Sequence, residues 1–385
     1  MSSYHSPSPL PEPSAEQIAH SQRLIECIVE HINRSGGVIS FADYMQHCLY
    51  EAGLGYYSAG AQKFGASGDF VTAPELSPLF SRTLARFAAS LFDQGLSSQV
   101  LEIGAGSGRL CLDMIEHWQQ QGVEWDGYLI LETSPDLQQR QRQLLAQQLD
   151  QPAMRKIHWL SEWPRSFNGL VLGNEVLDAM PLHVVLKQVQ WQELGVAFDG
   201  ERFQWREFSA DSDAVQRMHI IDADNQLPPD YCTEVNLLYE PWCQGLAQAC
   251  DQAVVLLIDY GYEQAQYYHP ARVSGTLQCF YQHRVHPDPF VYPGLQDITA
   301  FVDFDAFADA ALNAGFMLDG LTTQAEFLMQ NGLLELADLG SDDPMQQLAQ
   351  AQQVKTLTLP AEMGEKFKVI GLHKNLELKL IGLNN

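Results

Sequence analysis

The feature that most constrains the fold is a glycine-rich turn between an apolar run and an amphipathic helix. The apolar run spans residues 100–103, the turn carries Gly104, Gly106 and Gly108, and a helical pattern begins at Arg109. Glycines let the chain turn tightly and let the backbone approach a ligand without Cβ atoms in the way. The free N–H groups at the start of the helix favour an anionic group. The pattern therefore predicts a strand–turn–helix unit that binds a ligand.

Further apolar runs alternate with helical segments along the chain. The expected strands cover residues 128–131, 157–160, 170–172, 254–258, 316–322 and 366–372, and the expected helices include 110–121 and 135–149, the second of them polar and rich in glutamine. Buried strands that alternate with helices predict a mostly parallel sheet with helices on both faces. We therefore expect an α/β fold with a Rossmann-like core.

The spacing of the glycines discriminates between two ligands. A dinucleotide fingerprint, G-x-G-x-x-G, would place its third glycine at position 109, where the chain has Arg109. The observed spacing is G-x-G-x-G, it includes Ala105, and it follows the acidic Glu102, a pattern typical of class I methyltransferases. We therefore expect S-adenosylmethionine as the cofactor, and a dinucleotide-dependent oxidoreductase is the less favoured alternative.

Three later positions fit the same cofactor. Glu132 ends the second strand, 132 − 104 = 28 residues after the first glycine, where a carboxylate can accept hydrogen bonds from both ribose hydroxyls. Thr133 follows it, and Glu162 lies after the third strand, where an adenine edge would lie. Asn174 ends the fourth strand, beside the methionine end of the cofactor. Glu162 and Asn174 could instead lie on surface loops.

A segment before the glycine turn is a candidate lid over the cofactor. It contains Gly68, Asp69, Pro74 and Glu75, within a stretch rich in glycines and aromatic residues. The alternative is a rigid turn with no contact to a ligand.

Two carboxylates just after the fourth strand are the catalytic candidates. Glu175 and Asp178 are three residues apart, so on a helical turn they would share a face. Two carboxylates beside the cofactor could bind a guanidinium group in a bidentate manner. The alternative is that Asn174 or Asp178 caps a helix.

The chain resembles the MidA-like methyltransferase family, which includes a mitochondrial complex I assembly factor that is a protein arginine methyltransferase. The resemblance rests on the glycine turn and on the blocks at 54–58, 68–75, 174–181, 258–262, 275–277, 283–286, 297–299, 302–304 and 363–367. It implies a class I methyltransferase fold, S-adenosylmethionine as the methyl donor and an arginine-bearing protein as the acceptor. Ser81 and Phe301 depart from the family pattern. The alternative function is a non-catalytic assembly factor that binds the cofactor.

With these features, we expect five segments. They are a disordered tail over 1–16, a helical region with the cofactor lid over 17–93, the first half of the core over 94–189, an inserted β lobe over 190–250, and the second half of the core with substrate-cleft loops over 251–385. The lobe is indicated by alternating runs at 182–186, 190–196 and 202–208, with Asp199-Gly200 as a hairpin turn between the last two.

Charge and composition limit the partners. Twenty-two Lys and Arg residues against 48 Asp and Glu give a formal net charge of −26, which disfavours nucleic acid and anionic membranes and suits a basic protein segment. The same charge could serve solubility alone. The seven cysteines form no C-x-x-C pair and the first residues resemble no leader, so we expect reduced thiols and a cytoplasmic location. A homodimer is a candidate assembly.

His283, His286 and Asp288 have the H-x-x-H-x-D spacing of some metal ligands. Because no further Cys or carboxylate cluster completes the set, we expect no metal here and a loop that lines the substrate cleft instead.

Overall fold

The chain folds into two units, each built from segments that are far apart in the sequence. The computed structural model describes residues 10–59, 72–337 and 343–383. One unit takes residues up to 70 together with 179–238 and 265–301, and the other takes 71–178, 239–264 and 302–385. The contiguous segments predicted from the sequence differ from this division. The expected helical region divides between the two units after residue 70. The lobe begins before residue 190, because His183–Lys187 pairs with Trp191–Phe198 in one sheet.

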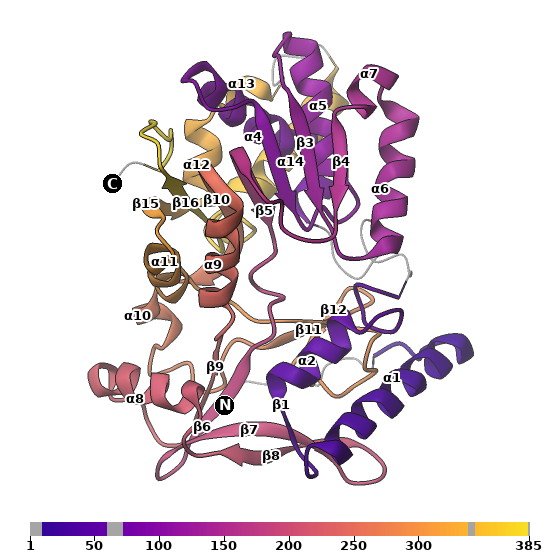
Figure 1. Cartoon of the computed structure of the whole chain (residues 1–385), viewed down its shortest axis with the longest axis vertical. Helices are drawn as coiled ribbons and strands as arrows, with labels where there is room; N and C mark the ends of the chain where they lie inside the picture. Colours follow the sequence, from indigo (N-terminus) through magenta and orange to yellow (C-terminus); the bar gives the residue numbers. More distant parts are fainter. Residues whose placement is uncertain (1–9, 60–71, 338–342, 384–385) are drawn as a thin grey trace. The chain divides into compact units, whose positions relative to one another are not determined.

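The large sheet belongs to the second unit (Figure 1). The glycine turn follows β2, an interior strand of this sheet between β5 and β3. The strand order is β15-β16-β10-β5-β2-β3-β4, with β14 paired to β10. The strands are β2 (Gln99–Ile103), β3 (Gly127–Leu131), β4 (Ile157–Leu160), β5 (Phe167–Asn174), β10 (Cys250–Tyr262), β14 (Val302–Asp303), β15 (Met317–Thr323) and β16 (Phe367–Lys374). Neighbours from β10 to β4 run parallel, whereas β16 is antiparallel to both β10 and β15.

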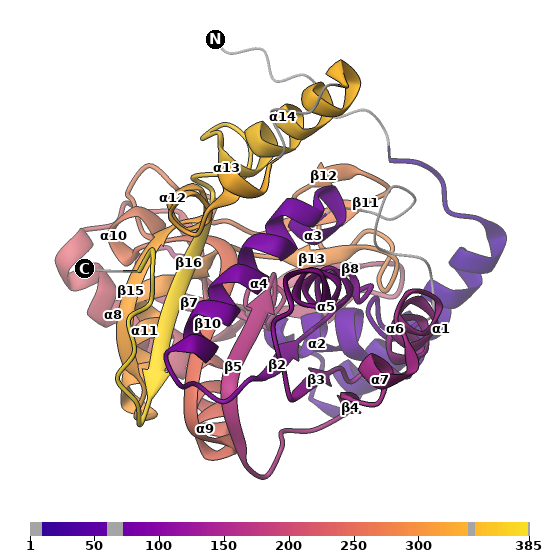
Figure 2. The same cartoon turned by 90° about the horizontal axis from the view of Figure 1, so that it is seen from above.

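Helices cover both faces of this sheet. The helices are α3 (Ala73–Leu76), α4 (Pro78–Asp93), α5 (Arg109–Gln121), α6 (Pro135–Gln148), α7 (Gln151–Met154), α9 (Tyr239–Ala249), α11 (Phe304–Asn313), α12 (Gln324–Gln330), α13 (Leu333–Leu336) and α14 (Pro344–Thr358). Helix α4 contacts α5, α12, α13 and α14, whereas α9 packs on α11 and β10, and Figure 2 shows α4 and α9 on opposite sides of β10. The predicted α/β architecture is therefore confirmed.

The core explains why β10 is so apolar. Val254, Leu256 and Ile258 on one face of the strand join the cluster that contains Phe87 of α4 and Trp118 of α5. Val255 and Leu257 on the other face are buried as well. A strand buried on both faces reads as a continuous apolar run, as the sequence shows here.

Within its described residues, the first unit contains two smaller sheets. One has the order β1-β7-β6-β9 with β8 paired to β7, and the other has the order β12-β11-β13. Its elements are α1 (Ala15–Arg34), β1 (Ile39–Ser40), α2 (Phe41–Tyr50), β6 (His183–Lys187), β7 (Trp191–Phe198), β8 (Phe203–Ser209), α8 (Asp213–Asn225), β9 (Tyr231–Val235), β11 (Gln278–Tyr281), β12 (Arg284–His286) and β13 (Asp297–Thr299). Helix α10 (Gln264–Tyr267) lies where the chain passes between the units. The predicted hairpin at Asp199 joins β7 to β8.

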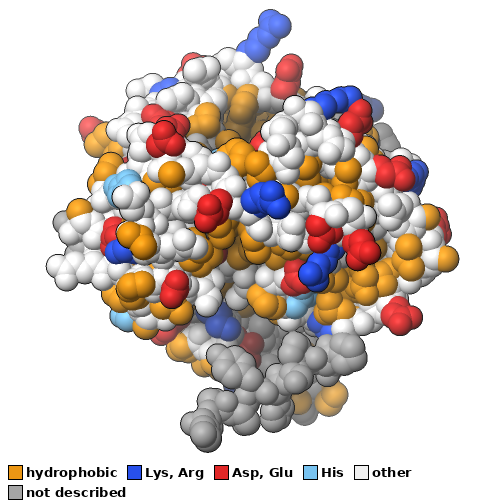
Figure 3. All heavy atoms as spheres, turned by 90° about the horizontal axis from the view of Figure 1, so that it is seen from below, with side chains coloured by type: hydrophobic (Ala, Val, Ile, Leu, Met, Phe, Trp, Pro, Cys, Tyr) orange, Lys and Arg blue, Asp and Glu red, His pale blue; other side chains and the backbone are white. Residues whose placement is uncertain are grey.

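Basic side chains stand singly among acidic and apolar ones on the face that Figure 3 shows. On that face they form no continuous positive patch of the kind that contacts phosphate backbones. Among the helices of the described ranges, none is both long and apolar enough to span a bilayer.

Candidate methyl-donor and acceptor site

Three glycines shape the turn after β2. Gly104, Gly106 and Gly108 have φ values of 66°, 53° and 86°, in the left-handed region that glycine adopts without steric cost. Gly108 is also the N-cap of α5 and has no side chain to cap the helix. Ser107 Oγ accepts a hydrogen bond from the Arg109 N–H at 3.3 Å. The turn therefore presents bare backbone at the start of a helix, as predicted, with Ala105 buried beneath it.

Two of the four lid candidates lie on α3, and one of them contacts the glycine turn. Glu75, on α3, accepts a hydrogen bond from the Ser107 hydroxyl, and Pro74 is buried in the first turn of the same short helix. Gly68 and Asp69 lie outside the described residues.

Glu132 lies directly after β3, and its carboxylate is held in place. Its side chain is only 7 % exposed, and Oε1 accepts a hydrogen bond from the Ser134 N–H at 2.9 Å. Burial raises the pKa of Glu132, and the hydrogen bonds from Ser134 and Gln141 oppose this rise. The neighbouring Thr133 is exposed. The carboxylate is thus oriented, and partly desolvated, where β2 and β3 end side by side.

Glu102 points into the core rather than to the surface. It is 3 % exposed, and its Oε2 accepts a hydrogen bond from the Tyr128 hydroxyl at 2.8 Å. Burial raises the pKa of Glu102 to about 7, Tyr128 lowers it, and the charge of Glu132 raises it. Glu102 therefore joins β2 to β3 just before the glycine turn, through its hydrogen bond with Tyr128.

The remaining cofactor candidates follow the next two strands. Glu162 is exposed after β4. Asn174 ends β5, and its Nδ2 donates to Glu175 Oε1 at 3.1 Å. Asn174 Oδ1 is buried and has no hydrogen-bond partner among the described residues. An acceptor left in this state is suited to a donor group on a ligand.

The segment after β5 is an irregular turn and not the helical turn that the spacing of Glu175 and Asp178 suggests. Glu175 has a φ of 54°, and its N–H continues the ladder with Ile258 O at 2.8 Å. Asp259 on β10 sets the shape of the turn, because its Oδ2 accepts hydrogen bonds from the N–H groups of Val176, Leu177 and Asp178 at 3.0, 2.8 and 3.2 Å. Glu175 and Asp178 therefore do not share a helix face.

The turn nevertheless gathers three carboxylates. Burial raises the pKa of Asp259, and the nearby charges of Asp178 and Glu175 raise it further, while backbone N–H groups oppose the rise. Asp178, 5 % exposed, accepts a hydrogen bond from the Tyr260 hydroxyl. A methyl group built on Gly104 would meet Val176 Cγ2 at 3.4 Å, so this turn lies next to the glycine turn.

Sequence reasoning missed two members of this site. Asp259 is a carboxylate at the end of the most apolar strand, and that position was the signal that could have identified it. Gln141, on α6, was assigned only to a polar helix, yet it is fully buried and bonded to Gly106 and Glu132.

The histidine motif lies in the first unit. His286 ends β12 and is 8 % exposed. Burial lowers its pKa, and the nearby Asp288 and Gln296 oppose that change. Within the described residues, His, Cys, Asp and Glu form no group of three or more that could hold a metal. The role of this loop in a substrate cleft stays a prediction.

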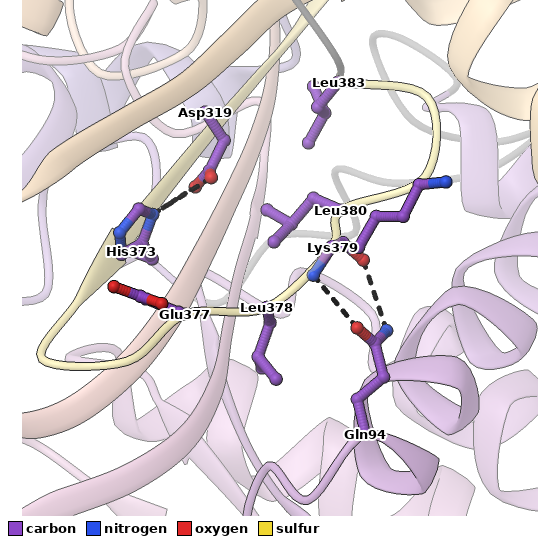
Figure 4. Close-up of a pocket in the computed structure, with 8 residues that line it drawn as sticks. All are labelled: Gln94, Asp319, His373, Glu377, Leu378, Lys379, Leu380 and Leu383. Carbon is purple, nitrogen blue, oxygen red and sulfur yellow. Dashed lines mark hydrogen bonds and ion pairs between the residues drawn. The ribbon is translucent and has the colours of Figure 1, made fainter.

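A cavity of about 630 Å³ lies elsewhere in the second unit. Figure 4 shows Asp319 and His373 pointing toward each other, with His373 Nδ1 2.9 Å from the carboxylate, and Gln94 bonded to the backbone of Lys379. None of the predicted site residues that the structure describes lines this cavity.

The residues at the carboxyl ends of β2, β3 and β5 fit S-adenosylmethionine. The glycine turn lacks a side chain at three positions, Glu132 offers a fixed carboxylate, and Asn174 offers a buried acceptor without a partner among the described residues. In open α/β sheets, ligands bind at this edge.

Comparison with known proteins supports the same ligand. A family model described as S-adenosyl-L-methionine-dependent methyltransferase matches residues 83–322. A Burkholderia thailandensis protein, whose crystal structure holds S-adenosyl-homocysteine, is 40% identical, with a TM-score of 0.90 and 97% of each chain covered.

Two curated relatives are named protein arginine methyltransferase NDUFAF7, mitochondrial. The Danio rerio protein is 29% identical over 86% of this chain and 82% of its own. The Drosophila melanogaster homolog is 30% identical over 88% of this chain and 82% of its own. These mitochondrial names contradict the predicted cytoplasmic location. Reduced cysteines indicate a reducing environment but do not distinguish one reducing compartment from another. With 240 of its 385 residues inside the matched range (322 − 83 + 1), the chain belongs to this family of S-adenosyl-L-methionine-dependent methyltransferases.

Proposed function

We propose that this methyltransferase modifies a guanidinium nitrogen on a protein arginine. Two observations support the proposal. The curated relatives that cover most of the chain carry the name protein arginine methyltransferase. In addition, the turn after β5 gathers Glu175, Asp178 and Asp259 next to the glycine turn. The cluster of carboxylates is the observation that carries the proposal.

A guanidinium group suits this cluster for electrostatic reasons. It is always cationic in water and offers five N–H donors in a planar fork, which a pair of carboxylates can bind. Asp259 already accepts backbone N–H groups, so we assign to it the shape of the turn. We assign the contact with the guanidinium to Glu175 and Asp178. The formal charge of −26 adds a long-range attraction for a basic segment of the substrate protein.

S-adenosylmethionine, when bound, supplies an electrophilic methyl group on a sulfonium centre. We propose that the glycine turn and the start of α5 hold its anionic end, that Asn174 accepts a donor of its methionine part, and that Glu132 binds its ribose. Thr133 and Glu162 are the candidates at the adenine side, with Pro74 and Glu75 over the turn. Each of these assignments is a proposal for this chain.

Glu175 and Asp178 have two tasks in this account. They localise the positive charge of the guanidinium away from the attacking nitrogen, which leaves electron density on that nitrogen. They also accept the proton that the nitrogen loses and pass it to water. The Tyr260 hydroxyl fixes one oxygen of Asp178, so the carboxylate can keep a single orientation.

The test is methyl transfer from labelled S-adenosylmethionine into proteins of a lysate from cells that lack this enzyme. The labelled protein is hydrolysed, and the methylated amino acid is identified by mass spectrometry. We expect methylarginine with the wild type, a large loss with Glu175→Gln and no loss with the matched control Glu124→Gln, since Glu124 is exposed. Label on another residue type would contradict the arginine assignment.

A non-catalytic assembly factor is the alternative that the same assay addresses. Cofactor binding without transfer to any protein would favour it. A homodimer stays a prediction, which sedimentation of the purified chain would decide.

A further inference from the structure

The glutamine-rich helix α6 directs two of its glutamines inward. Gln141 is fully buried and Gln138 is half-buried, whereas Gln139, Gln143 and others on the helix are exposed. Gln138 Nε2 donates to the backbone carbonyl of Glu132 at 2.7 Å. A buried primary amide needs partners for its donors and its acceptor, so the surroundings of Gln141 carry information about its role.

Gln141 contacts three parts of the donor site. Its Nε2 donates to Gly106 O at 3.0 Å and lies 3.4 Å from Glu132 Oε2, and its Oε1 accepts from Trp159 Nε1 at 2.9 Å. The indole N–H can only donate, so Oε1 must face Trp159 and the amide NH₂ must face the other two groups. The orientation of the amide is therefore fixed by chemistry.

The contact with the glycine turn is also steric. A methyl group built on Gly108 would lie 3.3 Å from Gln141 Cγ, closer than ordinary packing allows. The third glycine thus lets α6 approach the turn closely enough for the Gln141 amide to reach Gly106. One side chain consequently joins the end of β2, the end of β3 and, through Trp159, the strand β4.

We infer that Gln141 is a positioning residue for the methyl donor, because its amide ties the Gly106 carbonyl to the Glu132 carboxylate. The inference rests on the proposed role of Glu132 in ribose binding. The amide holds the Gly106 backbone and the Glu132 carboxylate at a fixed separation before S-adenosylmethionine binds. Less reorganisation is then needed on binding, which strengthens affinity.

Gln141→Glu is the informative variant, because it keeps the shape and retains an acceptor for Trp159. It replaces the NH₂ group by an oxygen that faces the Gly106 carbonyl and the Glu132 carboxylate. When two buried carboxylates are adjacent, the pKa of one of them is strongly raised, so the pair shares a proton at low pH. This proton restores the hydrogen-bond donor that the Gln141 NH₂ group supplied, and it is lost at high pH. Two charged groups of the described residues lie near this site. Glu102 on β2 interacts with Glu132, and the Arg142 guanidinium lies 3.9 Å from the Trp159 ring centre.

The experiment measures the dissociation constant of S-adenosylhomocysteine by calorimetry for the wild type and four variants. These are Gln141→Glu, Gln141→Ala, Glu132→Ala and the exposed control Gln143→Ala. For Gln141→Glu, we expect the ratio of its dissociation constant to that of the wild type to rise about tenfold or more between about pH 6 and about pH 8. Gln141→Ala should bind about tenfold more weakly at both, and Gln143→Ala should match the wild type.

A merely structural role for Gln141 would lower the urea midpoint of the unliganded protein but would leave the ratio independent of pH. If that result is found and Glu132→Ala still weakens binding, the inference about Gln141 is overturned and the proposed role of Glu132 is retained. An unchanged dissociation constant for Glu132→Ala would instead overturn the role of Glu132 on which the inference rests. If Gln141→Ala does not fold, the pH series of Gln141→Glu decides the question.

Discussion

Replacing Glu102 by Gln should stabilise the protein at high pH, although Glu102 lies in the glycine motif. The carboxyl is buried, and its pKa is raised to about 7 in the folded chain, from 4.5. Because the folded-state pKa is raised, the contribution of Glu102 to stability is fully present below the unfolded pKa. It is lost as the pH rises through the folded pKa.

The size of the effect follows from the two pKa values. A difference of 7 − 4.5 corresponds to about 3 kcal/mol of unfolding free energy, at about 1.4 kcal/mol for each tenfold change in proton affinity. Glutamine does not titrate, and it keeps an oxygen that can accept from Tyr128. Relative to the wild type, the variant should therefore gain about 2–3 kcal/mol of stability between about pH 5 and about pH 8.

The assay is urea unfolding of both proteins at these two pH values, without cofactor. Comparing the two differences cancels any cost of the substitution that does not depend on pH. Glu124→Gln serves as control, because Glu124 is exposed and should show no such trend. A stability difference between Glu102→Gln and the wild type that stays constant with pH would refute the reasoning and place the carboxyl in contact with water or a cation.

Four further predictions concern the donor and acceptor groups. Glu132→Ala should weaken binding of S-adenosylhomocysteine by about 1–3 kcal/mol, measured by calorimetry, because ribose hydroxyls lose a charged acceptor; an unchanged affinity would remove Glu132 from the site. Gly106→Val should abolish this binding, since a β-branched residue is strained at a φ of 53°, while circular dichroism still shows a folded chain. Tyr260→Phe should slow methyl transfer with cofactor affinity kept, because Asp178 loses its hydroxyl donor; unaltered turnover would make that contact structural. Glu175→Gln and Asp178→Asn should each slow transfer, and their effects in the double variant should be less than additive if both serve one cation.

The alternation of strands and helices could be predicted from the sequence because each core strand is apolar enough to stand out. The runs at 100–103 and 254–258 are buried on both faces, and serine residues mark several helix starts, such as Ser40, Ser77 and Ser134. The glycine turn was recognisable for a similar reason, since its backbone conformation requires glycine at three positions.

Other features depend on contacts between distant segments and could not be predicted. The turn at 175–178 is shaped by Asp259, more than eighty residues later (259 − 178 = 81), so local spacing wrongly suggested a helical turn. The burial of Gln141 depends on Trp159 and Gly106 together. The short strands β11, β12 and β13 and the strand β9 gave no clear pattern, because they are brief and lie among loops.

A crystal structure of this chain with S-adenosylhomocysteine tests the central claim most directly, because the claim is that one sheet edge holds both donor and acceptor groups. We expect the ribose hydroxyls within hydrogen-bonding distance of the Glu132 carboxylate and the amino-acid end at the glycine turn. We also expect the sulfur to lie beside the turn that carries Glu175 and Asp178. A sulfur atom that faces away from those two carboxylates, or a ribose without contact to Glu132, would contradict the account.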